Sequence, residues 1–226
     1  GERVAGLLHT INDEIGDRTL ATTGDINLVY GKDKIVEELL GLNFEISMKS
    51  FFQTNPKSAE KLYSKVIGYA LDRKETIDNN VVLDLFCGTG TIGQILASKS
   101  ENAQIVGVDI IKSAIINAQE NATRNGIEGV KFYAADVGKF LNEHPEYTGK
   151  IRTIILDPSR GGVAPKTMKK IINLGAERMV YVSCNPATQA RDTEQLVEAG
   201  YSIKKFSLVD QFPHTSHIET VVLFER

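Results

Sequence analysis

From residue 56 onward, short apolar runs alternate with amphipathic segments, and this alternation constrains the fold more than any other feature of the sequence. Apolar runs with the length of buried strands occur at 81–86, 105–108, 130–133, 153–156 and 179–182. Segments with helical periodicity occur at 56–70, 93–98, 113–124, 165–173 and 187–198. Because a helical crossover joins parallel strands, we predict a doubly wound, Rossmann-like α/β fold with a mainly parallel sheet.

The two ends of the chain depart from this alternation. Two strand-like runs at 202–209 and 219–224 follow each other without a helix, so we predict an antiparallel C-terminal strand at one edge of the sheet. Before residue 51 the sequence has short strand-like segments, at 18–21 and 27–30, separated by glycines. We therefore predict that residues 1–50 are the end of a preceding module, that residues 51–226 form the main domain, and that the chain is a piece of a longer protein.

The composition is that of a globular protein outside the membrane. The chain has 226 residues, of which 42% are hydrophobic, and no apolar run long enough to span a bilayer. The two cysteines are too few for a disulfide framework, so we expect a reducing cytoplasm. A net charge of −3 gives no overall attraction for nucleic acid, and any RNA contact would need a local basic patch.

A glycine-rich loop follows the first buried strand. Gly88, Gly90 and Gly93 satisfy the pattern G-x-G-x-x-G between a strand and a helix, where a ligand can approach free backbone N–H groups. Asp109 ends the next strand, 109 − 88 = 21 positions after the first glycine, where its carboxylate can accept hydrogen bonds from both hydroxyls of a ribose. A nucleoside cofactor is predicted, and a tight turn without a ligand is the alternative.

The glycine pattern fits both NAD and S-adenosylmethionine, since both present an adenosine to the same crevice. Asp84, just ahead of the loop, favours the second, because a carboxylate suits the cationic amino acid end of S-adenosylmethionine and repels a pyrophosphate. Asp136, after the third strand, is a candidate for the adenine amino group. An NAD-dependent oxidoreductase stays as the alternative enzyme class.

Further chemistry-bearing residues follow the later strands. Asp157 and Arg160 end the fourth strand at the edge where open α/β sheets bind ligands; Asp157 can bond a planar base edge, and Arg160 a phosphate. The alternative for Asp157 is an N-cap or a turn acid for the helix near residue 165. Cys184 follows the fifth strand and Glu219 opens the last one, which suggests a thiol nucleophile and a carboxylate base. The alternatives are a buried structural cysteine and a solvated glutamate.

Taken in order, five segments resemble one family. They are SFFQTN (50–55), LDLFCGTG (83–90), LDPSR (156–160), SCNP (183–186) and HIE (217–219). Together they resemble the S-adenosylmethionine-dependent RNA 5-methyluridine methyltransferases, from about residue 51 to the end. The resemblance implies that residues 51–226 are the catalytic domain and that the cofactor is S-adenosylmethionine. Its substrate is then a uridine in structured RNA, with ribosomal RNA favoured over transfer RNA, and we expect a monomer.

The resemblance also assigns residue roles. Cys184 is the nucleophile that adds to uracil C6, and Glu219 is the base that removes the C5 proton. Cofactor contacts fall on residues along the glycine loop and the strand ends: Gln53, Asp84, Phe86, Gly88, Gly90, Thr91, Asp109, Asp136 and Asp157. Asp157 also lies beside the target uracil in this assignment. From chemistry alone, the helix after Cys184 is expected to favour a thiolate.

Two aromatic residues complete the predicted substrate site. An enzyme that acts at C5 must take its target base out of any stack, so Phe51 or Phe52 is a candidate to stack on that base, while core packing is as reasonable for one of them. Cys87, His214 and His217 are expected to be structural or to contact substrate, with no metal bound. A non-catalytic RNA-binding scaffold with a vestigial site is the second alternative function.

Overall fold

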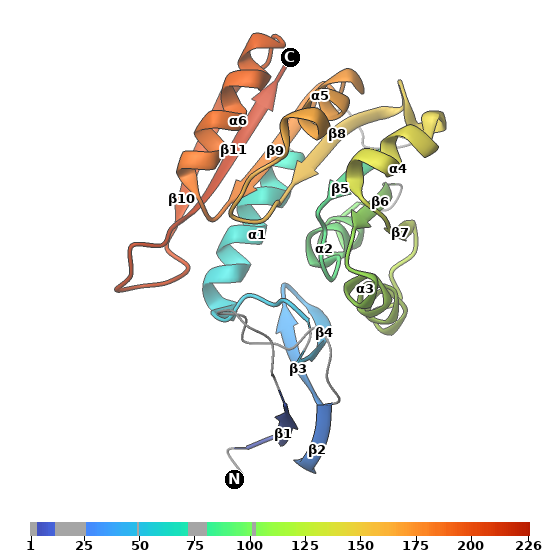
Figure 1. Cartoon of the computed structure of the whole chain (residues 1–226), viewed down its shortest axis with the longest axis vertical. Coiled ribbons are helices and arrows are strands. Elements are labelled where there is room, and N and C mark those ends of the chain that lie inside the picture. Colours follow the sequence, from blue (N-terminus) through green and yellow to red (C-terminus); the bar gives the residue numbers. More distant parts are fainter. Residues whose placement is uncertain (1–3, 12–25, 49, 72–80, 101–102) are drawn as a thin grey trace.

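The computed structural model describes residues 4–11, 26–48, 50–71, 81–100 and 103–226 (Figure 1). The predicted strand at 18–21 lies outside these residues. The strands are β1 (Gly6–Thr10), β2 (Ile26–Gly31), β3 (Lys34–Leu39), β4 (Leu42–Ser47), β5 (Val81–Leu85), β6 (Gln104–Asp109), β7 (Val130–Ala134), β8 (Ile151–Leu156), β9 (Arg178–Ser183), β10 (Ser202–Val209) and β11 (Glu219–Glu225). The helices are α1 (Pro56–Ala70), α2 (Thr91–Ser98), α3 (Lys112–Arg124), α4 (Val137–Glu143), α5 (Pro165–Asn173) and α6 (Pro186–Glu198), with a 3₁₀ turn at Pro145–Tyr147.

Seven of these strands form one sheet in the order β10-β11-β9-β8-β5-β6-β7. The pairs β6–β7, β5–β6, β5–β8 and β8–β9 are parallel, whereas β11 is antiparallel to both β9 and β10. The predicted doubly wound, mainly parallel fold with an antiparallel C-terminal strand is confirmed. The structure adds that β11 inserts between β9 and β10, so that β10 forms the outer edge.

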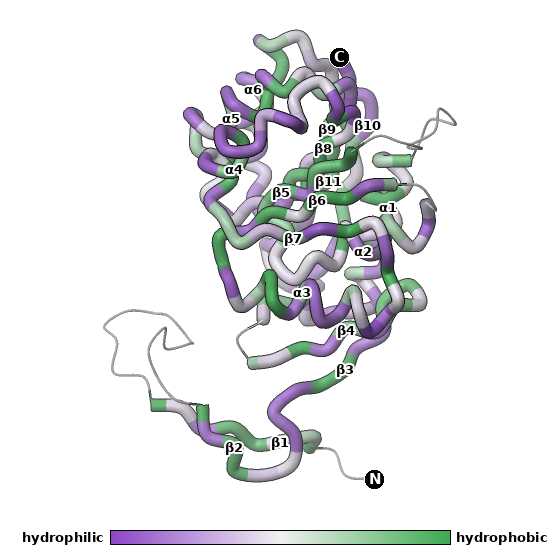
Figure 2. The backbone as a smooth tube through the Cα atoms, turned by 90° about the vertical axis from the view of Figure 1, so that its right-hand side faces the viewer, coloured by the Kyte–Doolittle hydropathy of each residue, from purple (hydrophilic) through white to green (hydrophobic). Residues whose placement is uncertain are grey.

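Helices cover both faces of this sheet. Figure 2 shows α4, α5 and α6 on one side of the strands and α1 and α2 on the other. Successive residues of a strand point to opposite faces of the sheet. Val82 packs in the core cluster with α1 and α2, and Leu83 packs in the core cluster with α4 to α6. Both side chains are almost fully buried, as expected of a strand covered on both faces. Within the described residues, no helix is long and apolar enough to cross a membrane.

Two hairpins precede the sheet. The β3–β4 hairpin packs against the domain: Phe44 is buried in the α1–α2 core cluster, and the backbone N–H of Glu45 donates to Asn121 Oδ1 of α3 at 2.8 Å. Asn125 Nδ2 donates to the Asn43 carbonyl at 3.0 Å. The β1–β2 hairpin lies further out, at the end of the molecule where the chain begins (Figure 1).

Candidate functional site

The predicted site residues that follow the parallel strands lie together because the carboxyl ends of those strands are in register. Leu85, the last residue of β5, pairs with Val108 of β6 and with Leu156 of β8. The chain segments that leave these strands carry the glycine loop, Asp109 and Asp157. On the other side of β8, Thr220 of β11 pairs with Ser183 of β9. Because this pair is antiparallel, Cys184 and Glu219 leave the ladder at the same end.

The glycine loop has a backbone that most side chains disfavour. Phe86 has φ of 62°, and its N–H donates to the Val108 carbonyl at 2.8 Å, which holds the loop against β6. Gly88 and Gly90 have φ of 53° and 68°, and Gly90 is the N-cap of α2. A Cβ at Gly88 would meet open space, whereas one at Gly90 would collide with the Phe132 ring. The Gly88 peptide is therefore accessible to a ligand, and the Gly90 peptide is packed from behind.

Two carboxylates brace this loop. Asp84 is fully buried in β5, and its Oδ2 accepts from the Gly93 N–H at 3.0 Å. Its Oδ1 is buried with no hydrogen-bond partner among the described residues. Burial, together with the nearby Asp109 carboxylate, raises the pKa of Asp84 to about 7, and the Gly93 bond opposes that rise. Asp109 Oδ2 accepts from the Gly88 N–H at 2.9 Å, and Oδ1 accepts from the Ile111 N–H at 2.8 Å.

The remaining predicted cofactor residues lie around the loop. Gln53 is buried in the segment before α1, and Thr91 is buried as the first residue of α2, with its hydroxyl 3.2 Å from that of Thr89. Asp136 is exposed and caps α4, where its Oδ1 accepts from the Lys139 N–H at 2.9 Å. A carboxylate oxygen that accepts one backbone N–H keeps a lone pair for a second donor, so the cap leaves Asp136 able to bind a ligand.

Cys184, Glu219, Asp157 and Arg160 form the second part of the site. Cys184 and Asp157 are half-buried, Glu219 is 4% exposed, and Arg160 is exposed. Burial raises the pKa of Glu219, and the Arg160 cation opposes that rise. Burial and the Glu219 and Asp84 carboxylates raise the pKa of Asp157 well above its usual range. The alternative role of Asp157 as a helix cap is wrong, since Ala164 is the N-cap of α5.

The Cys184 thiol is not activated in the way the sequence suggested. The helix that follows it was expected to favour a thiolate, yet burial raises the pKa of Cys184, and the Glu219 and Asp157 carboxylates add to the rise. Arg160 opposes them. Cys184 also lies one residue ahead of the N-cap, and Asn185 Oδ1, rather than the Cys184 sulfur, accepts from the Ala187 N–H of α6. The thiol form is therefore stabilised before a substrate arrives.

Side chains that the sequence analysis did not single out support these residues. The β8–α5 loop is fastened to α6: the Arg160 carbonyl accepts from Asn185 Nδ2 and from Thr188 Oγ1, both at 3.1 Å. Asp192, fully buried on α6, accepts from the Val163 N–H and from the Tyr181 hydroxyl, both at 2.7 Å. These bonds connect the loop that carries Asp157 and Arg160 to the helix that follows Cys184.

Aromatic residues of the N-terminal side divide between core and surface. Phe52 packs against Phe44 with ring centroids 6.2 Å apart, while Phe51 is 75% exposed. One of the pair is thus a core residue, and Phe51 stays a candidate for base stacking. Tyr63 of α1, which the sequence analysis missed, is buried near the site, where burial and then the Asp157, Glu219 and Asp84 carboxylates raise the pKa of its hydroxyl. Its sequence context on the apolar face of a helix gave no signal.

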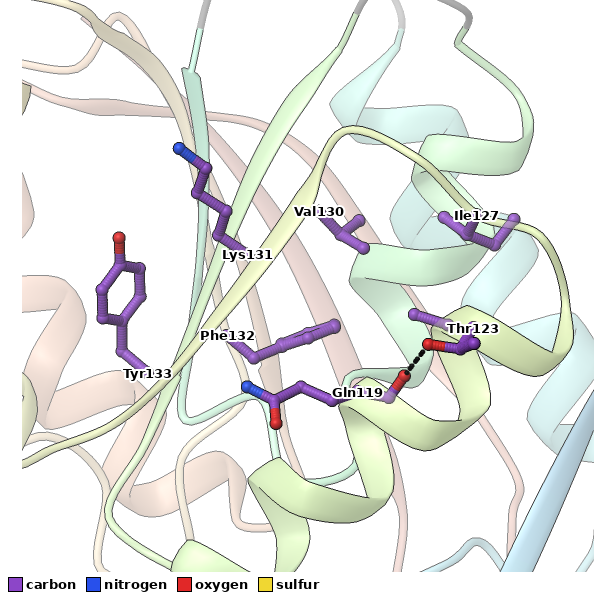
Figure 3. Close-up of a pocket in the computed structure, with 8 residues that line it drawn as sticks. Gln119, Thr123, Ile127, Val130, Lys131, Phe132 and Tyr133 are labelled. Carbon is purple, nitrogen blue, oxygen red and sulfur yellow. Dashed lines mark hydrogen bonds between the residues drawn. The ribbon is translucent and has the colours of Figure 1, made fainter.

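Other candidates lie apart from this chemistry. Within the described residues, no group of histidine, cysteine and acidic side chains could hold a metal ion. Burial, first of all, raises the pKa of Cys87 well above its usual range, which suits a packing role. A cavity of about 460 Å³ lies between α3 and β7, lined by Gln119, Thr123, Phe132 and neighbouring residues (Figure 3). None of the predicted site residues lines it.

The sheet order and the glycine loop define a Rossmann-like α/β fold. A S-adenosylmethionine-dependent methyltransferase from Agrobacterium tumefaciens matches with a TM-score of 0.65 over 90% of this chain and 74% of that protein, at 16% identity, which shows the shared fold. The profile of the family described as tRNA (Uracil-5-)-methyltransferase matches residues 18–226. The chain belongs to this family.

Individual relatives agree with this assignment. A RNA methyltransferase of Clostridium acetobutylicum is 46% identical over 98% of this chain, and one of Caldanaerobacter subterraneus is 43% identical over 99%. The crystal structure of Pyrococcus abyssi tRNA (uracil-54, C5)-methyltransferase in complex with S-adenosyl-L-homocysteine matches with a TM-score of 0.80, 31% identity and coverage of 97% of this chain and 50% of that one. The chain spans about half the length of the curated relatives it matches.

Proposed function

We propose that this chain carries the catalytic domain, residues 51–226, of an RNA methyltransferase that uses S-adenosylmethionine to methylate C5 of a uridine through a covalent bond from Cys184 to C6. The observation that carries the proposal is the exit of Cys184 and Glu219 from the same end of the β9–β11 ladder, beside Asp157 and Arg160. Family membership and the Pyrococcus abyssi neighbour support it.

The glycine loop fits the proposed cofactor. Asp84 Oδ1, which is buried and has no hydrogen-bond partner in the part of the chain that the structure describes, is suited to a cationic group such as the ammonium of the methionine part. The open space over Gly88 leaves room for a ligand, and Asp109 keeps lone pairs for ribose hydroxyls. When bound, S-adenosylmethionine supplies an electrophilic methyl group. The remaining proposed contacts are Gln53, Phe86, Gly90, Thr91, Asp136 and Asp157.

The chain's own residues then perform the covalent steps. The Cys184 thiol loses its proton to solvent or to a neighbouring carboxylate, and the thiolate forms a bond to C6, which moves the electron pair of the C5–C6 double bond toward the carbonyl oxygen at C4. C5 becomes enolate-like and would take the methyl group, whose bond to the sulfonium sulfur breaks so that a neutral thioether leaves. Glu219 removes the C5 proton, the double bond re-forms, and the C6–S bond breaks to return the thiolate.

The electrostatics of the pair suit this sequence of steps. A raised pKa makes Glu219 a stronger proton acceptor than an exposed glutamate. A raised pKa of Cys184 makes the sulfur a strong nucleophile once it is deprotonated, at the cost of a smaller thiolate fraction at neutral pH. In this proposal the Arg160 cation favours the thiolate and contacts an RNA phosphate, and the exposed Phe51 stacks on the target base.

The RNA class is the finer part of the proposal. The sequence favoured ribosomal RNA, whereas the Pyrococcus abyssi neighbour acts on uridine 54 of transfer RNA, so both RNAs are needed as substrates in the test. Monomeric state and cytoplasmic location stay predictions. An NAD-dependent oxidoreductase would instead bind NAD, and a scaffold would bind RNA without any covalent step.

The deciding experiment is intact-mass analysis of the protein after incubation with S-adenosylmethionine and 5-fluorouridine-substituted ribosomal or transfer RNA. Fluorine at C5 cannot leave as a proton, so a methylated covalent adduct should accumulate. We expect the adduct with wild type and with Cys87→Ala, which removes the other of the two cysteines, and none with Cys184→Ala. An adduct that persists in Cys184→Ala, or none in wild type that binds both cofactor and RNA, contradicts the covalent mechanism.

A further inference from the structure

A buried hydrogen-bond network lies directly behind the proposed catalytic pair. The Thr220 hydroxyl lies 3.0 Å from the Ser183 carbonyl oxygen and 2.7 Å from Gln189 Oε1. Gln189 Nε2 donates to the Tyr181 carbonyl oxygen at 3.0 Å, which fixes the orientation of the amide and turns Oε1 toward Thr220. One hydroxyl and one amide therefore join β11, β9 and α6.

Each member of this network is out of contact with water. Ser183, Thr220 and Gln189 are 1%, 1% and 3% exposed. A buried polar group that loses its partner costs more than the bond itself contributes, so these three groups strongly favour one arrangement. Thr220 has a single hydroxyl proton within reach of two acceptors, which ties its rotamer to the positions of both.

The hydrogen bonds of this network hold the backbone next to each proposed reacting group. The Ser183 carbonyl belongs to the peptide unit that leads into Cys184, and Thr220 is the residue after Glu219. Gln189 lies on the first turns of α6, the helix that starts two residues after Cys184. The backbone is thus held just before Cys184, soon after it, and next to Glu219.

We propose that Gln189 and Thr220 form a buried clasp that sets the position of the Cys184 sulfur relative to the Glu219 carboxylate, and that both are positioning residues for the reaction. This inference rests on the proposed function. Neither side chain touches the reacting atoms. The clasp matters because a nucleophile at C6 and a base at C5 must reach adjacent atoms of one ring, so that a shift of either by a fraction of an ångström slows the reaction.

The test compares variants of the clasp with a matched control elsewhere in the fold. Thr220→Val keeps the shape and removes the hydroxyl, Thr220→Ser restores it, and Gln189→Met removes the amide. Tyr201→Phe is the control: its hydroxyl is buried and donates to the Ala176 carbonyl at 2.6 Å, before the amino end of β9 and away from Cys184. It removes a bond of the same kind without touching the clasp.

The readouts separate positioning from stability. We expect Thr220→Val and Gln189→Met to lower kcat, and the rate of adduct formation on 5-fluorouridine RNA, by roughly tenfold or more, with KM for RNA and the Kd for cofactor little changed. Thr220→Ser should recover most of the rate. Tyr201→Phe should lower the Tm and leave kcat unchanged. If Thr220→Val does not fold, Gln189→Met carries the same test, since it leaves β11 intact.

Three results would overturn the clasp while the proposed function stands. They are a wild-type rate in both Thr220→Val and Gln189→Met, no recovery in Thr220→Ser, or an equal loss of kcat in Tyr201→Phe. Absence of an adduct in wild type that binds cofactor and RNA is a different result: the proposed function fails, and the clasp falls with it because no reacting pair exists to be positioned.

Discussion

Asp84 should make the stability of this protein depend on pH in a direction opposite to that of most aspartates. Its pKa rises from an ordinary value of 3.8 to about 7, because the carboxyl is fully buried in β5. The folded state therefore holds a proton between pH 4 and 7 that the unfolded state has released. The contribution of Asp84 to stability is therefore greatest below its pKa in the unfolded state and is lost as the pH rises toward its pKa in the folded state.

The size of the effect follows from the two pKa values. Each pH unit in this window costs about 1.4 kcal/mol, so the full window from 3.8 to about 7 costs about 4 kcal/mol. Asp84→Asn removes the charge and keeps an oxygen that can accept from the Gly93 N–H. The variant should match wild type near pH 4, where the acid is neutral, and exceed it in free energy of unfolding by up to about 4 kcal/mol near pH 8.

The assay is urea unfolding of both proteins without cofactor, monitored by circular dichroism and repeated at intervals from pH 4 to 8. The difference between the two free energies isolates Asp84 from the other carboxyls of the site. Asp33→Asn, at an exposed turn position, controls for the substitution itself. A difference between Asp84→Asn and wild type that stays constant across the pH range refutes the reasoning.

Three further predictions concern single substitutions. Arg160→Met removes the cation that lowers the pKa of Cys184, so the pH profile of adduct formation should shift to higher pH; an unshifted profile, measured by intact mass, contradicts this. Gly90→Ala forces a Cβ into a neighbouring ring and should cost about 1–3 kcal/mol in urea unfolding, more than Gly126→Ala, which is equally left-handed but open. Arg178→Met removes the buried partner of the ion pair between Arg178 and the half-buried Glu225, whose nitrogen and oxygen lie 2.7 Å apart, and should cost about 1.5–3 kcal/mol, seen as a lower Tm.

The parallel strands and most helices could be predicted because each is encoded locally. The predicted helix at 165–173 matches α5, and that at 113–124 differs from α3 by one residue. The helix expected from residue 93 begins at Thr91 instead, because the left-handed Gly90 ends the loop and serves as the N-cap. The short helix α4 was missed, since seven residues that include Gly138 show little periodicity.

Long-range features could not be read from the sequence. The insertion of β11 between β9 and β10 depends on how far the α6 crossover carries the chain, which no local pattern encodes. The chemistry-bearing residues stood out because they flank apolar strands at the edge where open α/β sheets bind ligands, and because their motifs resemble those of one family. Gln189 and Thr220 did not, because a glutamine in a helix and a threonine in a strand look ordinary until their burial and partners are known.

The carboxyl groups of the candidate site destabilise the folded state of the free protein at neutral pH. Asp84, Asp157 and Glu219 are buried or half-buried near one another, and each has a raised pKa because burial and neighbouring charge disfavour ionisation. Such a cluster weakens the folded state as the pH rises. The Gly93 N–H offsets part of this effect at Asp84, and the exposed Arg160 offsets part of it at Glu219. A cationic ligand beside Asp84 would reverse this penalty at Asp84, whose Oδ1 has no hydrogen-bond partner among the described residues. Under the proposed function, binding of the cofactor therefore restores to the folded state the stability that the buried Asp84 carboxylate removes in the free protein.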